Sequence, residues 1–347
     1  MTDRAPPATI RDVSVRAGVS IATVSRVLAG IGNSRPETTA AVRDAVAELG
    51  YRPSGVARSL RMRRTRTIGL IVTDIQNPFF PELVQAADDA ARAIGYSILL
   101  GSAAYDEHRA KHYMDLMVDR RVDGIIIASS QLSGESLDWL LSAPIPAVAV
   151  NADPGDLPVT VITSDNEGGS EQAVEHLVSL GHRRIAYVMG APDFTAALPR
   201  YTGFREACAS AGIALADAPA FEGQGQYDSG LRAAAQILAS GTGVTAIVCY
   251  NDVTAIGVLS ALRAAGHRVP DEMSVVGFDD IAAASWVTPG LTTIAQQKAE
   301  MGRLAVERLA SATDVALVPE VIRLPTSLRA RESSGPVTAA VSVVAVG

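Results

Sequence analysis

The chain of 347 residues is poor in the features that mark several protein classes. It has two cysteines, Cys208 and Cys249, which match no metal-ligand spacing and are predicted to be buried thiols rather than a disulfide. No apolar run approaches the roughly 18–20 residues of a membrane span. The N-terminal segment lacks the apolar core of a signal peptide, so we expect a cytoplasmic protein without a membrane anchor.

Catalytic and metal motifs are also missing. The sequence contains no nucleophile elbow, no phosphate-binding loop and no Cys/His cluster. These absences disfavour an enzyme and predict neither a metal nor a cofactor. The length of the chain, in contrast, favours two or three domains with sizeable cores.

Lysine is absent from residues 1–67, yet this segment is strongly basic. Twelve arginines against five acidic residues give it a charge of +7, and the remaining 18 basic and 32 acidic residues give −14. A basic head on an acidic body is typical of a nucleic-acid-binding module joined to a body that does not bind nucleic acid. If charge is the only evidence, the alternative interpretation of residues 1–67 is a solvated charged arm.

The basic head has the signals of three short helices. Residues 9–12 form a capping box, and Gly18 ends the helix that follows. Ser20 caps a second helix over residues 21–28, and a third runs from about Pro36 to a stop at Gly50. Three helices with a glycine-containing turn between the first two predict a helix-turn-helix domain.

The second of these helices has an outward face suited to the DNA major groove. Val24, Val27 and Leu28 recur on one buried face, which leaves small side chains and one arginine outside. Arg26 can donate paired hydrogen bonds to guanine, and apolar side chains can touch a thymine methyl group. The alternative is that this outward face is simply the exposed surface of a three-helix bundle and has no role in DNA binding. The candidate DNA contacts on this helix are Ile21, Ala22, Thr23, Ser25 and Arg26.

The head resembles the DNA-binding domain of the LacI/GalR family of bacterial transcriptional regulators. The resemblance rests on "ATIRDVSVRAGVSIATVSRVLAG" (residues 8–30) and "PETTAAVRDAVAELGYRPSGVARSL" (residues 36–60). It implies that Ile21, Ala22 and Arg26 read bases. It also implies that residues 53–60 form a hinge helix on the operator, with a leucine wedged into the minor groove. The hinge contacts implied are Val56, Ala57, Arg58 and Leu60.

Two departures from the family pattern bear on operator affinity and sequence preference. Gly55 stands where the family usually has a better helix former, at a cost of about 1 kcal/mol in helix propensity. The segment "AGIGNSRPET" (residues 29–38) replaces the usual asparagine and valine of the second turn.

The acidic body alternates apolar strands with helical stretches. A first set of strands is expected at 68–72, 96–100, 124–129 and 147–151, and a second set at 159–165, 184–190, 246–252 and 274–280. Repeated strand–helix units predict two doubly wound lobes with parallel sheets and a ligand cleft between them. Ligands in such folds bind beyond the carboxyl ends of the strands. The strand ends here carry Asp74, Ser129, Asn151, the "YND" of 250–252 and the "GFDD" of 277–280.

Residues 68–331 also resemble the effector domain of the same family, which is similar to periplasmic sugar-binding proteins. The resemblance implies chain crossings between the lobes near residues 162, 291 and 323, and a homodimer on a palindromic operator. Gly225 departs from it, because an aromatic residue is common there, and Tyr227 is a possible substitute. The effector contacts implied are Asn77, Phe79, Phe80, Arg200, Asn251, Asp279 and Gln296.

These features predict a DNA-binding repressor that a small sugar releases. Phe194 and Ala196 replace the polar pair of purine-responsive members, which favours a sugar over a purine. The alternatives are a catabolite-type regulator co-activated by a phosphorylated partner protein, a solute-binding protein for transport, and an enzyme.

Four segments are expected along the chain: a helix-turn-helix domain (1–52), a hinge helix and linker (53–67), the two-lobed body (68–331) and a disordered tail (332–347). The tail lacks the leucine heptads of a tetramerising helix, which favours a dimer over a tetramer.

Overall fold

The computed structural model describes residues 8–29, 34–51, 64–129, 134–142, 145–152, 155, 157, 159–311 and 318–337. The chain divides into two compact units, an N-terminal unit (Met1–Thr65) and a C-terminal unit (Arg66–Gly347). Among the described residues, no helix combines the length and the apolar character that a membrane span needs.

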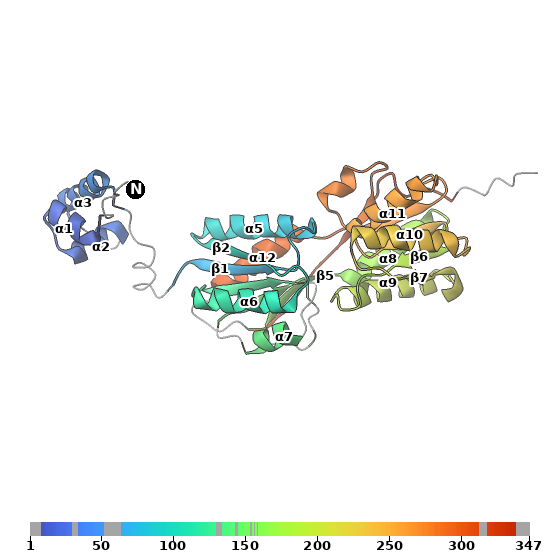
Figure 1. Ribbon diagram of the computed structural model, residues 1–347, viewed down its shortest axis with the longest axis horizontal. Coiled ribbons are helices and arrows are strands. Elements are labelled where there is room, and N and C mark those ends of the chain that lie inside the picture. Colours follow the sequence, from blue (N-terminus) through green and yellow to red (C-terminus); the bar gives the residue numbers. More distant parts are fainter. Residues whose placement is uncertain are drawn as a thin grey trace, which may run out of the picture. The chain divides into compact units, whose positions relative to one another are not determined.

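The N-terminal unit contains three helices, α1 (Ile10–Ala17), α2 (Ile21–Ala29) and α3 (Pro36–Leu49), visible in Figure 1. The predicted capping box is present, because Thr9 N donates to Asp12 Oδ2 at 2.8 Å and Asp12 N donates to Thr9 Oγ1 at 3.4 Å. Gly18 and Gly50 end α1 and α3 with φ of +65° and +58°, a conformation that favours glycine. The predicted helix-turn-helix architecture is therefore confirmed. Its core is made by Val13, Val24, Val42 and Ala45.

The C-terminal unit contains two six-stranded sheets, each covered by helices on both faces (Figure 1). The first sheet is parallel throughout, in the order β11-β5-β4-β3-β1-β2. Its strands are β1 (Thr67–Val72), β2 (Ser97–Ser102), β3 (Gly124–Ala128), β4 (Ala147–Val150), β5 (Thr160–Ser164) and β11 (Val321–Leu324). Its helices are α5 (Phe79–Ala93), α6 (Glu107–Asp119), α7 (Gly134–Leu141) and α12 (Lys298–Ser311).

The second sheet has the order β12-β10-β9-β8-β6-β7, and only β12 runs antiparallel to its neighbour. Its strands are β6 (Ile185–Val188), β7 (Ala220–Phe221), β8 (Ala246–Cys249), β9 (Ser274–Asp279), β10 (Thr292–Ala295) and β12 (Ser327–Arg329). Its helices are α8 (Asn166–Ser179), α9 (Ala197–Ser210), α10 (Tyr227–Ala239) and α11 (Asp252–Ala264), with short 3₁₀ turns at Leu215–Asp217 and Ala282–Ser285.

The central strands of both sheets are buried on two faces, which explains why they read as continuous apolar runs. In β3, Ile126 packs with α5 and α12 on one face, whereas Ile125 and Ile127 pack with α6 on the other. Successive strand residues point to opposite faces, so a strand covered on both sides needs apolar residues at every position. The same arrangement places Cys208 and Cys249 in the interior as free thiols, as predicted.

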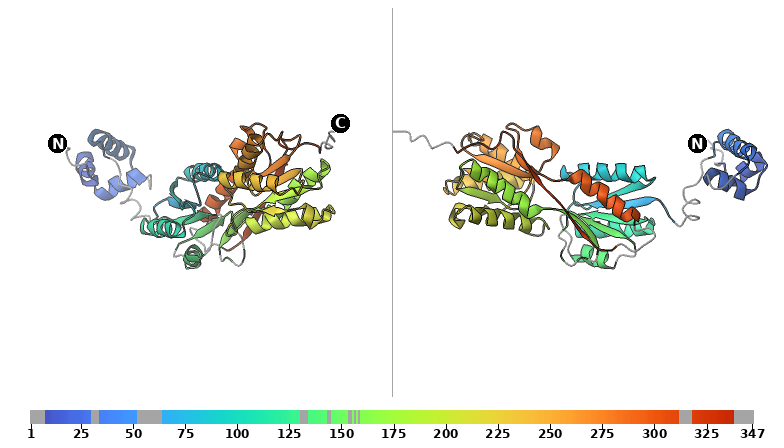
Figure 2. Two further views of the ribbon diagram at one scale, coloured as in Figure 1. Left: turned by 45° about the vertical axis from the view of Figure 1, so that its right-hand side comes forward. Right: turned by 180° about the vertical axis from the view of Figure 1, so that it is seen from behind.

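The two lobes are linked by three chain crossings, which Figure 2 shows from behind. They lie between β5 and α8, between β10 and α12, and between β11 and β12. Two expectations were wrong here. The strand at 160–164 pairs with β4 in the first sheet, although the sequence grouped it with the second. The middle crossing follows β10, which pairs with β9, and does not precede it near 291. Apolar runs locate strands but do not identify their partners.

The expected disordered tail from residue 332 is wrong for residues 332–337. Ser333 is fully buried, and its Oγ donates to Val275 O at 2.6 Å and accepts from Thr292 N at 2.8 Å. His182 Nε2 lies 3.0 Å from Gly335 O, and His176 Nε2 lies 2.8 Å from Ser334 Oγ. The segment is ordered because its polar groups complete the second lobe. Residues 338–347 lie outside the described residues.

Replacing Ser333 by alanine tests this anchoring. Ser333→Ala would leave a buried carbonyl and a buried N–H without partners, so we expect a loss of about 1–3 kcal/mol in the free energy of unfolding. Urea unfolding followed by circular dichroism measures it. Ser327→Ala, at an exposed position of β12, is the control and is expected to change stability by less than about 0.5 kcal/mol. Equal stabilities of the two variants would refute the anchoring role.

Candidate functional site

Polar and aromatic side chains from both lobes line a small cavity, which we call the aromatic cavity. It offers about 20 Å³ to the centre of a water molecule, roughly the room of one water. It lies where β4, β8, β9 and β10 end, the edge at which parallel sheets bind ligands. Its lining residues are Asn77, Phe79, Tyr105, Asn151, Phe194, Arg200, Tyr250, Asn251, Asp279 and Gln296.

Two asparagines are held at the cavity by the starts of helices. Asn77 Oδ1 accepts from Phe79 N at 3.0 Å, in the turn that opens α5. Asn251 caps α11 by accepting from Thr254 N at 2.9 Å, and its amide donates to Gly225 O at 2.9 Å. The cap fixes the asparagine side chain relative to the lobe that carries it.

Arg200 is the centre of a buried polar network. Its Nε donates to Asn166 Oδ1 at 2.9 Å, and its Nη1 donates to Tyr250 O at 2.6 Å. Its Nη2 lies 3.4 Å from Asp279 Oδ1, and the guanidinium lies 3.7 Å from the centre of the Phe278 ring. Arg200 is 2% exposed, so the charge is compensated entirely by these neighbours.

Asp279 is the anionic partner and is itself extensively bonded. Gln296 Nε2 donates to its Oδ1 at 2.6 Å, and Lys298 Nζ donates to its backbone carbonyl at 2.6 Å. Burial raises the pKa of Asp279, whereas the charges of Arg200 and Lys298 act in the opposite direction. Gln296 Oε1 and Asn151 Oδ1 are buried and have no hydrogen-bond partner in the described part of the chain. Two acceptors are therefore available to a ligand that donates hydrogen bonds.

Three rings form the aromatic side of the cavity. Tyr105 and Phe194 are stacked with centroids 5.8 Å apart and planes at 20°, and Phe194 lies 5.8 Å from Tyr250. Burial raises the pKa of Tyr105 and of Tyr250 to about 12, so both phenols are neutral at pH 7. A Cβ on Gly225 would lie 2.8 Å from Phe194 Cε2, so Phe194 excludes a side chain there. Tyr227 is 40% exposed and is not among the lining residues.

Six of the seven effector residues expected from the sequence line this one cavity, and Phe80 does not. Phe80 is 1% exposed in the core of the first lobe, with its ring edge-on to Phe79 at 5.1 Å. Consecutive helical residues point about 100° apart, so only Phe79 faces the cavity. Sequence reasoning nominated Asn151 and Tyr250 as strand-end candidates for ligand binding but did not include them among the seven effector contacts. It also left out Tyr105 and Phe194, which lie in loops without a periodic signal.

A second carboxylate lies behind the cavity, where Asp252 is fully buried. It accepts hydrogen bonds from Thr293 Oγ1 and from Ile281 N, the latter at 2.8 Å. Burial raises the pKa of Asp252 well above its usual value, and the Asp279 charge raises it further. Because the folded state holds this proton more tightly than the unfolded chain does, its stabilising contribution is complete below about pH 4. That contribution is lost as the pH rises through the raised pKa.

Asp252→Asn is therefore expected to gain in stability relative to the parent protein as the pH rises. An asparagine resembles the protonated acid and needs no proton from solution. The measurement compares the thermal midpoints of both proteins between pH 5 and pH 8. A midpoint difference that grows in favour of the variant confirms the raised pKa, whereas a constant difference contradicts it.

The N-terminal unit presents the expected face of α2. Ile21, Ala22 and Arg26 are exposed, with Ile21 at 46%, and Val24 is fully buried. Ser20 Oγ accepts from Thr23 N at 3.2 Å, and Arg26 Nη2 donates to Thr23 Oγ1 at 3.5 Å. Thr23 and Ser25 are half-buried at the edges of this face. The hinge residues Val56, Ala57, Arg58 and Leu60 lie outside the described residues.

A helix-turn-helix unit joined to a two-lobed body with an interlobe cavity defines a DNA-binding transcriptional regulator, and comparison with known proteins agrees. Residues 9–54 match the model of bacterial regulatory proteins of the lacI family, and residues 174–334 match a periplasmic binding protein-like domain. The chain is 37% identical to the HTH-type transcriptional repressor PurR of Haemophilus influenzae (strain PittEE). This match spans 303 residues, 87% of this chain and 90% of that protein.

The chain is also similar to solved structures of this family's regulators over nearly its whole length. The lac repressor dimer bound to operator and the anti-inducer ONPF is 30% identical, with a TM-score of 0.87, over 95% of this chain and 100% of that one. A CelR–cellobiose complex is 31% identical, with a TM-score of 0.71, over 94% and 99%. The chain belongs to the LacI/GalR family and is a DNA-binding transcriptional repressor.

Proposed function

We propose that the protein represses transcription in the cytoplasm by binding a palindromic operator as a homodimer, and that a small sugar in the aromatic cavity releases it. The observation that carries the effector assignment is the convergence of six expected residues on one interlobe cavity. Amides, a carboxylate and a guanidinium beside aromatic rings are the groups that bind sugar hydroxyls and cover C–H faces.

The size of the aromatic cavity supports an opening of the lobes on binding. A space for about one water cannot hold a sugar ring, so entry of the ring requires the lobes to separate or the three rings to part. A ligand that binds the open arrangement better shifts the population toward it by its difference in affinity. We propose that this shift disfavours the DNA-bound dimer, and a few kcal/mol suffices for a tenfold release or more.

DNA recognition is assigned to the exposed face of α2. Ile21, Ala22 and Arg26 are proposed to contact base edges, and Thr23 and Ser25 to contact phosphates or bases. The hinge segment keeps its proposed role in the minor groove through Val56, Ala57, Arg58 and Leu60.

A purine co-repressor is the second candidate for the effector. The stacked rings of Tyr105 and Phe194 could face a planar base, and the relatives named PurR make a purine the natural alternative. Phe194 and Ala196 disfavour a purine, because their side chains supply no hydrogen bond to a base. A phosphorylated partner protein as co-activator is the third candidate.

Selection from a pool of random DNA tests the repressor assignment and identifies the operator in the same experiment. The full-length protein is expected to enrich a palindrome whose half-sites are related by a two-fold axis. Adding the effector sugar should lower affinity for the selected sequence at least tenfold. Enrichment of non-palindromic sites would overturn the dimeric arrangement. Tighter binding on addition of a purine would favour the second candidate.

A further inference from the structure

Lysine is nearly absent from the chain, and one of its two lysines is buried. The 30 basic residues include only Lys111 and Lys298 as lysines, and the others are arginines. The Lys111 side chain is 42% exposed and pairs with Asp115, whereas the Lys298 side chain is 3% exposed. Lys298 is also the first residue of α12, where the helix dipole disfavours a cation. A cation at a position with both costs requires strong compensating contacts.

The compensating contacts of Lys298 come from both lobes. Its Nζ donates to Asp279 O at 2.6 Å and to Asp280 O at 2.9 Å, where β9 of the second lobe ends. The same Nζ lies 3.3 Å from Glu82 Oε2 on α5 of the first lobe. An ammonium group is a compact donor on a flexible stem, so it can serve acceptors that converge from different directions. Lysine is therefore the cation suited to this interlobe position.

The two carbonyls belong to a backbone segment that is fixed in the second lobe. Asp279 and Asp280 have φ of +119° and +53°, a region that residues other than glycine rarely adopt. Ile281 N donates to Asp252 Oδ2 at 2.8 Å, and Arg331 Nη2 donates to Asp280 Oδ1 at 2.6 Å. A conformation of this kind persists only where the surrounding structure enforces it. Lys298 therefore contacts a rigid part of the second lobe.

The first-lobe side of the contact is equally constrained. Gly302 of α12 lies so close to α5 that a Cβ there would be 2.3 Å from Leu83 O. The two helices therefore pack backbone to backbone, and Glu82 and Lys298 hold their positions relative to each other. The interlobe hydrogen bonds of Lys298 consequently connect two rigid bodies.

Lys298 closes a short ring across the middle crossing. Ala295, the last residue of β10, is paired with Asp279 of β9, and Gln296 and Gln297 lead from there to Lys298. The Lys298 side chain returns to the carbonyl of Asp279 and completes the ring. Hydrogen bonds weaken steeply when they lengthen or bend, so rotation of the lobes about this crossing weakens both interlobe bonds.

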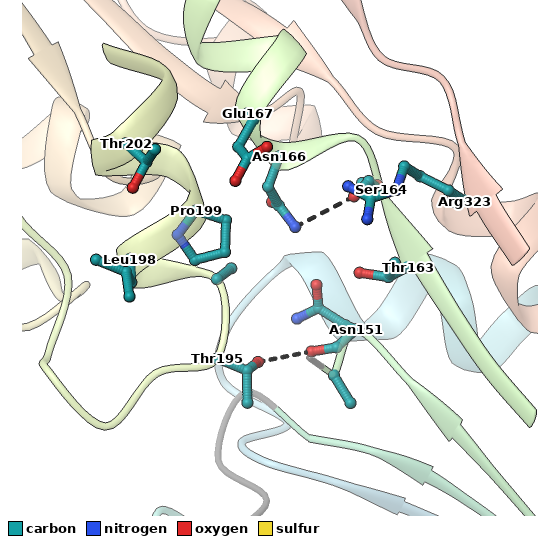
Figure 3. A pocket seen from close by; sticks show the side chains of 12 residues that line it. Asn151, Thr163, Ser164, Asn166, Glu167, Thr195, Leu198, Pro199, Thr202 and Arg323 are labelled. Atoms are coloured by element: carbon teal, nitrogen blue, oxygen red, sulfur yellow. Dashed lines mark hydrogen bonds between the residues drawn. The ribbon is translucent and has the colours of Figure 1, made fainter. Parts of the chain in front are cut away.

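The other two crossings are held by bonds of a different kind. Asp165 N, at the first crossing, donates to Leu324 O, at the third, at 2.9 Å. Figure 3 shows the first crossing from close by, where Asn166 Nδ2 donates to Ser164 O at 3.3 Å. These bonds join residues of the crossing segments to one another. Lys298 instead joins a helix of one lobe to a strand end of the other.

We propose that Lys298 is a positioning residue that locks the middle crossing and holds the lobes in the orientation in which the aromatic cavity is small. Without this lock the lobes sample a wider range of orientations even when no ligand is bound. The consequence for DNA binding rests on the function proposed above, in which parted lobes disfavour the operator complex. Loss of the lock then shifts the unliganded protein toward the released state.

Spin-label distances between the lobes test the lock without any ligand. Labels are attached to the full-length protein at Asp119→Cys on α6 and Gln236→Cys on α10, which are exposed positions, whereas the native cysteines are buried. Dilution with unlabelled protein limits each oligomer to one labelled copy. Lys298→Met keeps most of the side-chain volume and removes its donors. Lys298→Gln keeps an N–H donor on a shorter stem and replaces Lys298→Met if that variant does not fold.

Two controls separate the lock from a general loss of charge. Glu82→Gln removes the ion pair within the first lobe and leaves the interlobe bonds, and Lys111→Met removes the other lysine. Pulsed electron paramagnetic resonance is expected to show a distance distribution about twofold broader or more for Lys298→Met, and an intermediate one for Lys298→Gln. Both controls should keep the distribution of the parent. An unchanged distribution in the Lys298 variants, even with reduced stability, overturns the lock.

Operator affinity distinguishes failure of the lock from failure of the proposed function. Measured by fluorescence anisotropy without sugar, Lys298→Met is expected to bind the selected operator about fivefold more weakly than the parent, or weaker still. Lys111→Met should change this affinity by less than about twofold. A broader distance distribution with the operator affinity of the parent would support the lock and overturn the proposed link between lobe orientation and DNA release.

Discussion

Arg200→Met is expected to lower the free energy of unfolding by about 3–5 kcal/mol, because it removes the cation from a fully buried ion pair. Asp279 would lose its closest positive charge, and the carbonyl of Tyr250 and Oδ1 of Asn166 would lose their donor. Chemical denaturation measures the loss. The matched control is Arg205→Met, which removes an exposed arginine from the same helix and is expected to cost less than about 1 kcal/mol.

The pH dependence of this variant gives a second, independent signature. Without Arg200, nothing on α9 opposes the effect of burial, so the pKa of Asp279 should rise further. A carboxyl group with a raised folded-state pKa stabilises the fold below the unfolded pKa and loses that contribution as the pH rises. The destabilisation should therefore be smaller at pH 5 than at pH 8, and Arg200→Met/Asp279→Asn should recover part of it. A loss that does not depend on pH would contradict the charge-pair account.

Arg26→Ala is expected to weaken binding to the selected operator by about 1–3 kcal/mol, which is roughly 5- to 150-fold, while affinity for random DNA changes little. The reason is the exposed position of Arg26 on α2, where its guanidinium can donate two hydrogen bonds to a guanine. Fluorescence anisotropy with both DNAs at one fixed salt concentration measures the ratio.

Arg43→Ala is the matched control for DNA binding, because it removes the same charge from an exposed position on α3. Loss of a general positive charge lowers affinity for both DNAs by the same factor. Only a base contact changes the ratio between them. Equal losses on the operator and on random DNA for Arg26→Ala would therefore remove Arg26 from the base-reading residues.

The helices of the N-terminal unit could be predicted closely because their signals are local. The capping box at Thr9 and the glycines at 18 and 50 act within a few residues of themselves, and each marks a helix boundary found in the structure. The buried strands of the body could also be located, since burial on both faces requires apolar runs. The partly exposed strands β7, β11 and β12 were not predicted, because they lack such runs. Strand partners could not be predicted, because the pairing of β5 with β4 depends on contacts distant in sequence.

The lining of the aromatic cavity was predictable where a residue is held by a strand end or a helix start, as for Asn251 and Asp279. Phe80 does not line the cavity, because adjacent aromatic residues of a helix carry the same composition signal but point in different directions. Phe194 was not predicted as a lining residue because its position depends on close packing against Gly225, which only the fold provides. The ordered conformation of residues 332–337 likewise depends on hydrogen bonds to β9 and β10, which the sequence of the tail does not predict.

A thermal-shift screen of the full-length protein tests the central claim most directly. The panel contains pentoses, hexoses, disaccharides, sugar phosphates and purines. A ligand at 100 times its dissociation constant stabilises the fold by about 2.7 kcal/mol, which the screen resolves. The account predicts stabilisation by a neutral sugar, and loss of that stabilisation in Arg200→Met. Stabilisation by a purine alone, or by no compound of the panel, would contradict the sugar-responsive repressor proposed here.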